Sequence, residues 1–556
     1  MTTVAPRTRA AAVAVPTRGR PADTLAGLGA MVRFVVHRNR VRLAVWLVVL
    51  VGLFAYVGAY YKSLFTTQQA LDDFAKVSDT PGIRALTGLA AAPNTLGGAV
   101  WTKVWMTSAL ALAFGVVFLV TRNGRADEEV GRTELLRSRE LGLHAYSAAS
   151  WLVCAVLSVL VGALITVVSA ASGLDPYGTG ITGSLIVGAS VTGVGLVGLG
   201  VGAVAGQVAS TSRGANALGS AVLGVLYVLR MVGDLGDGRL TWASPVGWGQ
   251  EMQPWGADRW WPFGLLVVLA VVLAVVLLAL ATVLEAHRDH GAGLMPQRPG
   301  PAGAPVRYAT PLGLGLRLQR GPVVGWSVTV VLSGLLFGSV VHAMDNLLND
   351  AGGPLPAILR GRGIDALMAV LAGMIALVVA VFAVQSATTL RADEASGLVE
   401  TQLAGALSRT RWALQRLLIP AVGAAVLLAA GGALLGASYG ATVHDGSWTG
   451  RMAAASLVYW PAVMVLVGVA VTLFGWLPRL AVALTWGLLA ALWFVMLIGD
   501  ALHLPAWVLD VLPFSATPYL PLDPMRWTPV VVMTAVAALL VWAGVDRFAR
   551  RDVVPG

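Results

Sequence analysis

The chain has 556 residues, of which 57% are hydrophobic and 12% are charged, about half the charged fraction that is usual in soluble domains. This composition excludes a water-soluble fold, because apolar stretches of about 20 residues recur along the sequence and each can cross a hydrocarbon layer as a helix. The single cysteine, Cys154, lies in an apolar stretch, which excludes a disulfide framework, a thiolate metal cluster and a Cys-x-x-Cys redox pair. The net charge of +10 does not require a nucleic-acid partner, and none is expected, because the positions of the arginines along the chain, described below, account for it.

The N-terminal residues come before any long apolar run. Residues 1–24 are rich in Ala, Pro, Thr and Arg without apolar periodicity, which predicts a disordered cytoplasmic tail. Residues 25–42 then carry apolar side chains at helical spacing beside Arg33, Arg38 and Arg40. This pattern predicts a helix on the membrane surface whose arginines reach the lipid headgroups.

About twelve apolar segments are predicted to span the membrane, which gives an all-α polytopic membrane protein. They are residues 41–61, 98–120, 148–170, 178–207, 215–236, 262–284, 323–344, 366–388, 413–436, 453–477, 480–499 and 528–546. Twelve spans place both chain ends on one side, together with the arginines of the tail, the central linker and residues 547–551. The positive-inside rule identifies that side as the cytoplasmic face of the cell membrane.

The sequence contains an internal duplication. The segment Arg125-Ala-Asp-Glu-x-x-Gly-x-x-Glu134 matches Arg391-Ala-Asp-Glu-x-x-Gly-x-x-Glu400 at an offset of 266 residues. Near the start of each copy, Arg40 and Trp46 match Arg320 and Trp326 at an offset of 280. A near-constant offset at several separate places indicates two copies of one unit.

The duplication predicts the domain organisation. Residues 25–285 form a first six-helix half and residues 311–556 a second one, joined by a Pro- and Gly-rich cytoplasmic linker at 286–310. Because each half has six spans, the two copies run parallel and are related by a pseudo-twofold axis along the membrane normal.

The duplicated segment lies between the second and third spans of each half and is its most charged part. Asp127 and Glu134 are expected on one helical face, and Gly131 between them is expected to let another backbone approach closely. Two interpretations fit the segment: a solvated helix cap, or a docking element for a soluble partner that bears arginines. Docking is favoured because the acid-Gly-Glu spacing is retained in both copies.

Residues 125–138, Arg-Ala-Asp-Glu-Glu-Val-Gly-Arg-Thr-Glu-Leu-Leu-Arg-Ser, resemble the RxExxxGTxELLxxxPxS signature in the cytoplasmic loop of ABC-2 type permeases, the six-helix membrane subunits of ABC exporters. With two fused halves, the chain looks most like actinobacterial exporters of polyketide antibiotics, the tetronasin-resistance type. The second copy departs from the pattern at Leu398-Val-Glu-Thr-Gln, and the expected proline is missing from both copies. A weaker or differently shaped second docking surface is therefore expected.

The resemblance implies that each charged loop is a coupling helix seated in a groove of one nucleotide-binding ATPase subunit, two per chain. ATP and Mg²⁺ would belong to those subunits, since this sequence has no Gly-x-x-x-x-Gly-Lys-[Ser/Thr] phosphate-binding motif. The chain itself is expected to be no enzyme and to hold no cofactor or metal. The residues implied in coupling are Arg125, Asp127, Glu128, Gly131, Glu134, Arg391, Asp393, Glu394, Gly397 and Glu400.

In this family the second and fifth spans of each half are expected to line the substrate path. The large side chains there are Trp101, Trp105, Tyr227, Arg230, Met231, Met368, Trp486, Trp493, Phe494 and Met496. Ordinary helix or lipid contact explains each of them taken singly. Arg230 in particular either contacts substrate or is neutralised by Asp234, four residues later on the same helical face.

The predicted function is that of a permease subunit that moves hydrophobic or amphipathic compounds, such as drugs and polyketide-like antibiotics, out of the cell. The first alternative is an ion-driven twelve-span drug efflux carrier, which the scarcity of Asp, Glu and His within the spans disfavours. A second alternative is a membrane enzyme acting on a lipid-linked substrate. That class usually needs clustered acids for Mg²⁺, and the acidic clusters here lie on the predicted ATPase-facing side.

Overall fold

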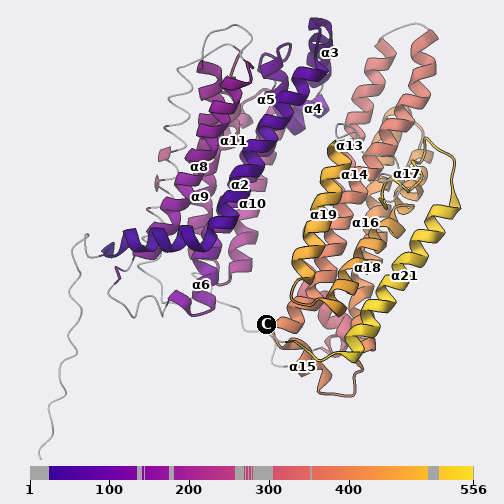
Figure 1. Cartoon of the computed structure of the whole chain (residues 1–556). Coiled ribbons are helices and arrows are strands. Elements are labelled where there is room, and N and C mark those ends of the chain that lie inside the picture. Colours follow the sequence, from indigo (N-terminus) through magenta and orange to yellow (C-terminus); the bar gives the residue numbers. More distant parts are fainter. Residues whose placement is uncertain are drawn as a thin grey trace, which may run out of the picture. The chain divides into compact units, whose positions relative to one another are not determined.

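A computed structural model of the chain divides it into two compact units, Met1–Pro299 and Gly300–Gly556 (Figure 1). The boundary falls within residues 286–310, which the sequence predicts as a linker and which lie mostly outside the described residues. All regular structure in the described residues is helical, which confirms the all-α membrane fold. The structure describes residues 24–79, 81–89, 91–133, 141–142, 144–174, 181–256, 268, 271–272, 275–276, 279, 303, 305–350, 354–498 and 512–554.

Ten helices in the described part of the chain are long and apolar enough to cross a membrane. Of the two other predicted spans, 480–499 corresponds to the shorter apolar helix α19 (Ala481–Ile498), and 262–284 lies almost entirely outside the described residues. The number twelve therefore stays a prediction. The ten are α2 (Leu28–Leu64), α5 (Leu96–Asn123), α8 (Ala145–Ala171), α9 (Thr182–Val208), α10 (Ser212–Leu235), α13 (Pro311–Asp350), α14 (Pro354–Ala395), α16 (Arg409–Val443), α17 (Ser447–Leu457) continued by α18 (Trp460–Trp476), and α21 (Trp527–Arg550).

The first unit is built around α5 and α9, most of whose residues are buried. Small residues allow these two helices to pack closely: a Cβ added at Gly198 of α9 would lie 2.7 Å from the backbone of Ala113 in α5. Helices α2, α8 and α10 cover this pair and leave their outer faces exposed, as helices in contact with lipid do. At one end of the unit lie the short helices α3 (Gln68–Ser78), α4 (Pro81–Thr87), η1 (Leu240–Ala243) and α11 (Pro245–Gln250).

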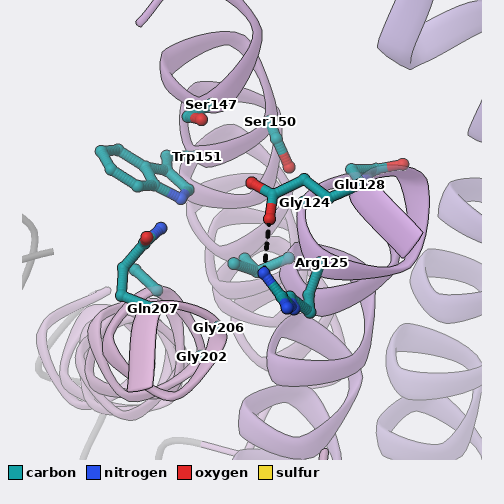
Figure 2. Close-up of a pocket in the computed structure, with 12 residues that line it drawn as sticks. Gly124, Arg125, Glu128, Ser147, Ser150, Trp151, Gly202, Gly206 and Gln207 are labelled. Atoms are coloured by element: carbon teal, nitrogen blue, oxygen red, sulfur yellow. Dashed lines mark hydrogen bonds and ion pairs between the residues drawn. The ribbon is translucent and has the colours of Figure 1, made fainter. Parts of the chain in front are cut away.

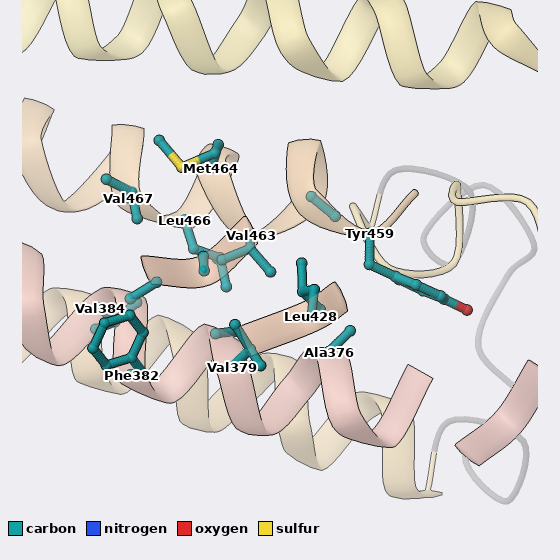
Figure 3. Packing of buried hydrophobic residues seen from close by; sticks show 14 of the residues in the cluster. Ala376, Val379, Phe382, Val384, Leu428, Tyr459, Val463, Met464, Leu466 and Val467 are labelled. Atoms are coloured by element: carbon teal, nitrogen blue, oxygen red, sulfur yellow. The ribbon is translucent and has the colours of Figure 1, made fainter. Parts of the chain in front are cut away.

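The second unit is built around α14 and α18. Figure 3 shows Val379 and Phe382 of α14 packed toward Val463 and Leu466 of α18, with Leu428 of α16 beside them. Helices α13, α16, α17, α19 and α21 surround this core. The side chains of this cluster pack against one another through shape and apolar contact.

The same helix pairs are in contact in both units. Helix α2 contacts α5 and α8 as α13 contacts α14 and α16, and α10 contacts α5 and α9 as α19 contacts α14 and α18. A buried polar pair recurs as well: Asn39 Nδ2 donates to Asn123 Oδ1 at 3.0 Å, and Gln319 Nε2 donates to Thr389 Oγ1 at 3.1 Å. These partners are related by the offsets of 280 and 266 found in the sequence, which supports the duplication.

The predicted surface helix is continuous with the first span. Helix α2 begins at Leu28, lies across one end of the unit, and then bends to run along the other helices (Figure 1). Arg33 and Arg40 are exposed, as predicted. Arg38 is an exception, because its guanidinium turns inward to Asp127 instead of reaching toward headgroups.

Candidate functional site

The first charged loop follows α5, and residues 125–133 of it are described. It begins with the short helix α6 (Arg125–Glu129). The buried Arg125 guanidinium pairs with Glu128 at 2.8 Å and donates from Nε to the carbonyl of Ser210 at 2.9 Å. Glu129 accepts hydrogen bonds from the backbone N–H and the hydroxyl of Ser212, at 2.8 and 2.6 Å. Both contacts fasten α6 to the start of α10.

Asp127 joins three helices at the centre of this loop. Its side chain is 2% exposed and accepts hydrogen bonds from both terminal nitrogens of Arg38 in α2, at 2.5 and 2.7 Å. The Tyr146 hydroxyl of α8 donates to it at 2.6 Å, and Arg132 approaches to 3.2 Å. A bidentate guanidinium contact on a buried carboxylate is among the strongest polar interactions in proteins. The loop is thereby fixed to the bend of α2.

The second loop, residues 391–408, is fastened by different partners. Glu394, at the end of α14, is fully buried and accepts hydrogen bonds from both terminal nitrogens of Arg551 at 2.6 and 3.0 Å. It also accepts from Arg391 at 3.0 Å and from the backbone N–H of Val554 at 3.0 Å. Asp393 pairs with Arg416 of α16. The residues that follow α21 are thus held against the second loop.

Two features recur at matching positions in both loops. The i,i+3 ion pair Arg125–Glu128 has its counterpart in Arg391–Glu394. Gly131 and Gly397 both adopt left-handed backbone conformations, with φ of 70° and 73°. Each glycine stands two residues after the last residue of a helix, where such a conformation ends the helix without steric cost.

This geometry corrects two sequence expectations. Among the described residues, a Cβ at Gly131 or at Gly397 would have no neighbour within 4 Å, so within this part of the chain positive φ and not close backbone approach explains the glycine. Asp127 and Glu134 do not share one continuous helix, because α6 ends at Glu129, and Glu134 itself lies outside the described residues. In the second loop the helix break places Asp393 in α14 and Glu400 in the separate helix α15 (Leu398–Leu403).

Apart from Glu134, which lies outside the described residues, the residues implied in coupling fall into two groups. Six of them hold the loops in place through buried or largely buried ion pairs: Arg125, Asp127, Glu128, Arg391, Asp393 and Glu394. Glu400 is exposed, and the partly exposed Gly131 and Gly397 stand at the turns. In the described part of the two loops, the surface open to a partner is formed by the turn residues and by α15 with the exposed residues 404–406 after it.

A small cavity lies behind the first loop, beside the Arg125–Glu128 ion pair (Figure 2). Its volume is about 20 Å³, which is room for a single water molecule. Ser150 of α8 and Gln207 of α9 also line it, and the buried Ser150 hydroxyl has no hydrogen-bond partner among the described residues. The cavity therefore suits a structural water and is too small for a drug-sized ligand.

Large side chains expected on the substrate path are mostly packed within their own units. Trp101 and Trp105 are buried and stack with ring centroids 4.5 Å apart, and the Trp105 indole donates to Ser190 at 2.7 Å. Met368 is fully buried in the second core. The others lie elsewhere: Met231 is partly buried, Trp486 and Trp493 are 37% and 39% exposed, and the side chains of Phe494 and Met496 lie outside the described residues.

Arg230 belongs to a buried polar cluster. It pairs with Asp234 at 3.1 Å, with both side chains fully buried, and donates to the carbonyl of Ala85 at 2.5 Å. The side-chain amide of Gln250 bridges the cluster, since its Oε1 accepts from Arg230 and its Nε2 donates to Asp234. The Tyr227 ring lies 4.9 Å from the guanidinium carbon. The arginine thus joins α10 to α4 and α11, and the neutralised-charge interpretation fits this geometry.

Sequence reasoning missed the basic partners of the loop acids. Arg38, Arg416 and Arg551 each lie at a predicted membrane boundary, where positive charge is ordinary. The only signal was their clustering on the same predicted side as the acids. Nothing in the spacing of residues separated by 89 or 157 positions pairs one arginine with one acid.

Two comparisons with known proteins bear on the chain. A multidrug efflux system permease protein, Rv1217c of Mycobacterium tuberculosis (strain ATCC 25618 / H37Rv), is 34% identical over 558 aligned residues that cover 99% of each chain. The family described as "Multidrug efflux system permease Rv1217c, C-terminal domain" matches residues 308–549, which are the helices of the second unit. The similarity therefore extends over both units.

Proposed function

Because this chain belongs to the family of the multidrug efflux system permease Rv1217c, we propose that it is the transmembrane subunit of an ATP-driven ABC exporter. Its cargo is a class of hydrophobic or amphipathic compounds, such as drugs and polyketide-like antibiotics. Two separate nucleotide-binding subunits bind ATP and Mg²⁺ and dock on the charged loops at the cytoplasmic face, where both chain termini also lie.

The observation that carries this proposal is the repetition of one rigid element at the same place in both units. Each loop ends a long membrane helix with an internal Arg–Glu ion pair and a left-handed glycine. A loop that transmits the motion of a partner to the membrane helices must be rigid. Buried ion pairs with further hydrogen bonds supply that rigidity. Two such elements suit two copies of one kind of partner.

The geometry changes which groups we assign to docking. Asp127 and Glu394 are satisfied inside their units and have no free carboxylate oxygen to offer to a partner's arginine. Glu400 is exposed, and in the described part of the chain it makes no ion pair. We therefore assign recognition to the turn surfaces and to Glu400, and positioning to the buried pairs.

The ion-driven alternative requires a group within the membrane that binds and releases a proton. Among the described residues of the predicted spans, Asp234 has a fully buried side chain, and it is occupied by Arg230, Gln250 and Thr241. An acid held by a buried cation and two hydrogen bonds is poorly suited to carry protons. This observation favours energy coupling from outside the membrane.

Reversing the charge of Glu400 tests the docking assignment. Glu400→Arg is expected to raise about 5-fold the concentration of ATPase subunit that gives half-maximal drug-stimulated ATP hydrolysis. This factor corresponds to a loss of roughly 1 kcal/mol of binding free energy at an exposed charged site. The measurement is ATP hydrolysis by the reconstituted permease as its ATPase subunit is titrated. Asp237→Arg, an exposed site at the far end of α10 from the first loop, is the control. Equal titration curves for wild type and Glu400→Arg would contradict docking at this residue.

A further inference from the structure

An apolar groove opens beside the bend of α2 in the first unit. It lies between the early turns of α2 and the first half of α8, has a volume of about 420 Å³, and every side chain that lines it is apolar. Val36, Val156 and Leu160 contribute to its walls and are 43%, 48% and 46% exposed. The volume falls in the range of pockets that hold small molecules.

Two arginines flank this groove on the same helix. Arg40 stands one turn from both Val36 and Ala44, which line the groove, and Arg33 precedes Arg40 by two turns. Residues four or seven apart lie on one helical face. Both arginines are exposed, and neither makes a hydrogen bond or ion pair with the described part of the chain. By contrast, Arg38 on the inner side is fully occupied by Asp127 and Tyr146.

Positive charge beside an apolar groove at the surface of a membrane protein is complementary to a molecule that has an anionic headgroup and a hydrocarbon tail. We propose that the groove binds one acyl chain of an anionic phospholipid and that Arg33 and Arg40 bind its phosphate. Arginine contacts phosphate through two parallel N–H donors, and basic sites beside membrane helices attract anionic headgroups. No residue of the charged loop lines the groove, and the site does not depend on the energy source of transport.

The second half offers a natural control because it retains one of the two arginines and alters the lining at two positions. Arg320 matches Arg40 at the offset of 280 and is also exposed. At the matching positions of the lining, Ser327 replaces Leu47 and Gly423 replaces Leu157. The other lining positions stay apolar, but Gly313 stands at the position that matches Arg33. The second half therefore lacks the second arginine, and we expect the lipid site in the first unit alone.

Native mass spectrometry of the full chain in nanodiscs of phosphatidylglycerol and phosphatidylcholine, mixed equally, tests the proposal. Wild-type protein is expected to retain phosphatidylglycerol preferentially, and Arg40→Gln to lower the ratio of bound phosphatidylglycerol to phosphatidylcholine about 5-fold, the effect of one arginine near a membrane surface. Arg320→Gln is expected to leave the ratio unchanged. Equal retention of both lipids by wild type, or equal loss in both variants, would overturn the site.

A second variant distinguishes a lipid bound in the groove from lipid attracted non-specifically by the arginines. Ala44→Phe fills the groove with an aromatic ring and leaves both arginines in place, so retained lipid is expected to fall at least 5-fold while the thermal unfolding midpoint stays close to that of wild type. Ala44 is exposed, which makes a larger side chain tolerable for folding. If Ala44→Phe retained as much phosphatidylglycerol as wild type, the lipid would not sit in the groove and the proposal would be wrong.

Discussion

Glu394→Ala is expected to lower the free energy of unfolding of the second unit by about 3 kcal/mol, because breaking a buried ion pair leaves its partners uncompensated. The Glu394 side chain is fully buried and holds Arg551, whose side chain is only 9% exposed. The same carboxylate accepts hydrogen bonds from Arg391 and from the Val554 backbone. Its loss should free the residues after α21, and this is measured by denaturant unfolding and by proteolysis at the C-terminus.

Matched variants show whether the loss of stability in Glu394→Ala comes from burial of the ion pair or from the loss of one negative charge. Glu400→Ala removes an exposed acid six residues further on and is expected to change the unfolding free energy by no more than about 0.5 kcal/mol. The double variant Glu394→Met with Arg551→Met should recover part of the lost stability, since Arg551 no longer leaves a buried charge, although Arg391 still loses its acid partner. Equal unfolding curves for Glu394→Ala and Glu400→Ala would refute the positioning role of Glu394.

Arg230→Met is expected to destabilise the first unit by about 3 to 5 kcal/mol, because Asp234 is left fully buried without its cationic partner. Methionine is the residue at the matching position of the second half, Met496, so the change introduces a side chain that the fold accepts elsewhere. The carbonyl of Ala85 also loses its guanidinium donor. We expect a lower unfolding midpoint and earlier proteolysis near α4 and α11, measured on the purified chain.

The double variant Arg230→Met with Asp234→Leu distinguishes the two interpretations of Arg230. If the arginine only neutralises Asp234, removing both charges restores stability and leaves the profile of exported drugs unchanged. If it contacts substrate, Arg230→Met leaves stability intact and changes the drug profile. A normal unfolding midpoint with altered drug selectivity would therefore contradict the structural role.

Sequence patterns predicted the elements whose signal is local. Ten spans follow from apolar length alone, and the duplicated segment by itself indicates two equivalent loops. The pairing of charges was out of reach because it depends on packing between distant helices. Arg38 and Asp127 are 89 residues apart, and Glu394 and Arg551 are 157 apart. The two loops are also held in place by arginines from non-equivalent positions, Arg38 in the first unit and Arg551 in the second. The sequence repeat alone does not indicate this difference.

The prediction of a continuous acidic helix failed for a local reason. Seven-residue spacing between Asp127 and Glu134 suggested one helical face, yet the glycine between them is a strong helix terminator in the left-handed conformation. Both copies carry it, at Gly131 and Gly397. Giving the retained glycine more weight than the spacing of the acids would have predicted a helix, a turn and a second short helix, which is the arrangement seen at α14 and α15.

Transport in sealed liposomes tests the source of energy most directly. The purified chain is reconstituted alone or with its ATPase subunit, and accumulation of a fluorescent hydrophobic drug is followed with ATP or with an imposed proton gradient. We predict uphill accumulation only when both the ATPase subunit and ATP are present. Accumulation by the chain alone, driven by the proton gradient without ATP, would contradict the account.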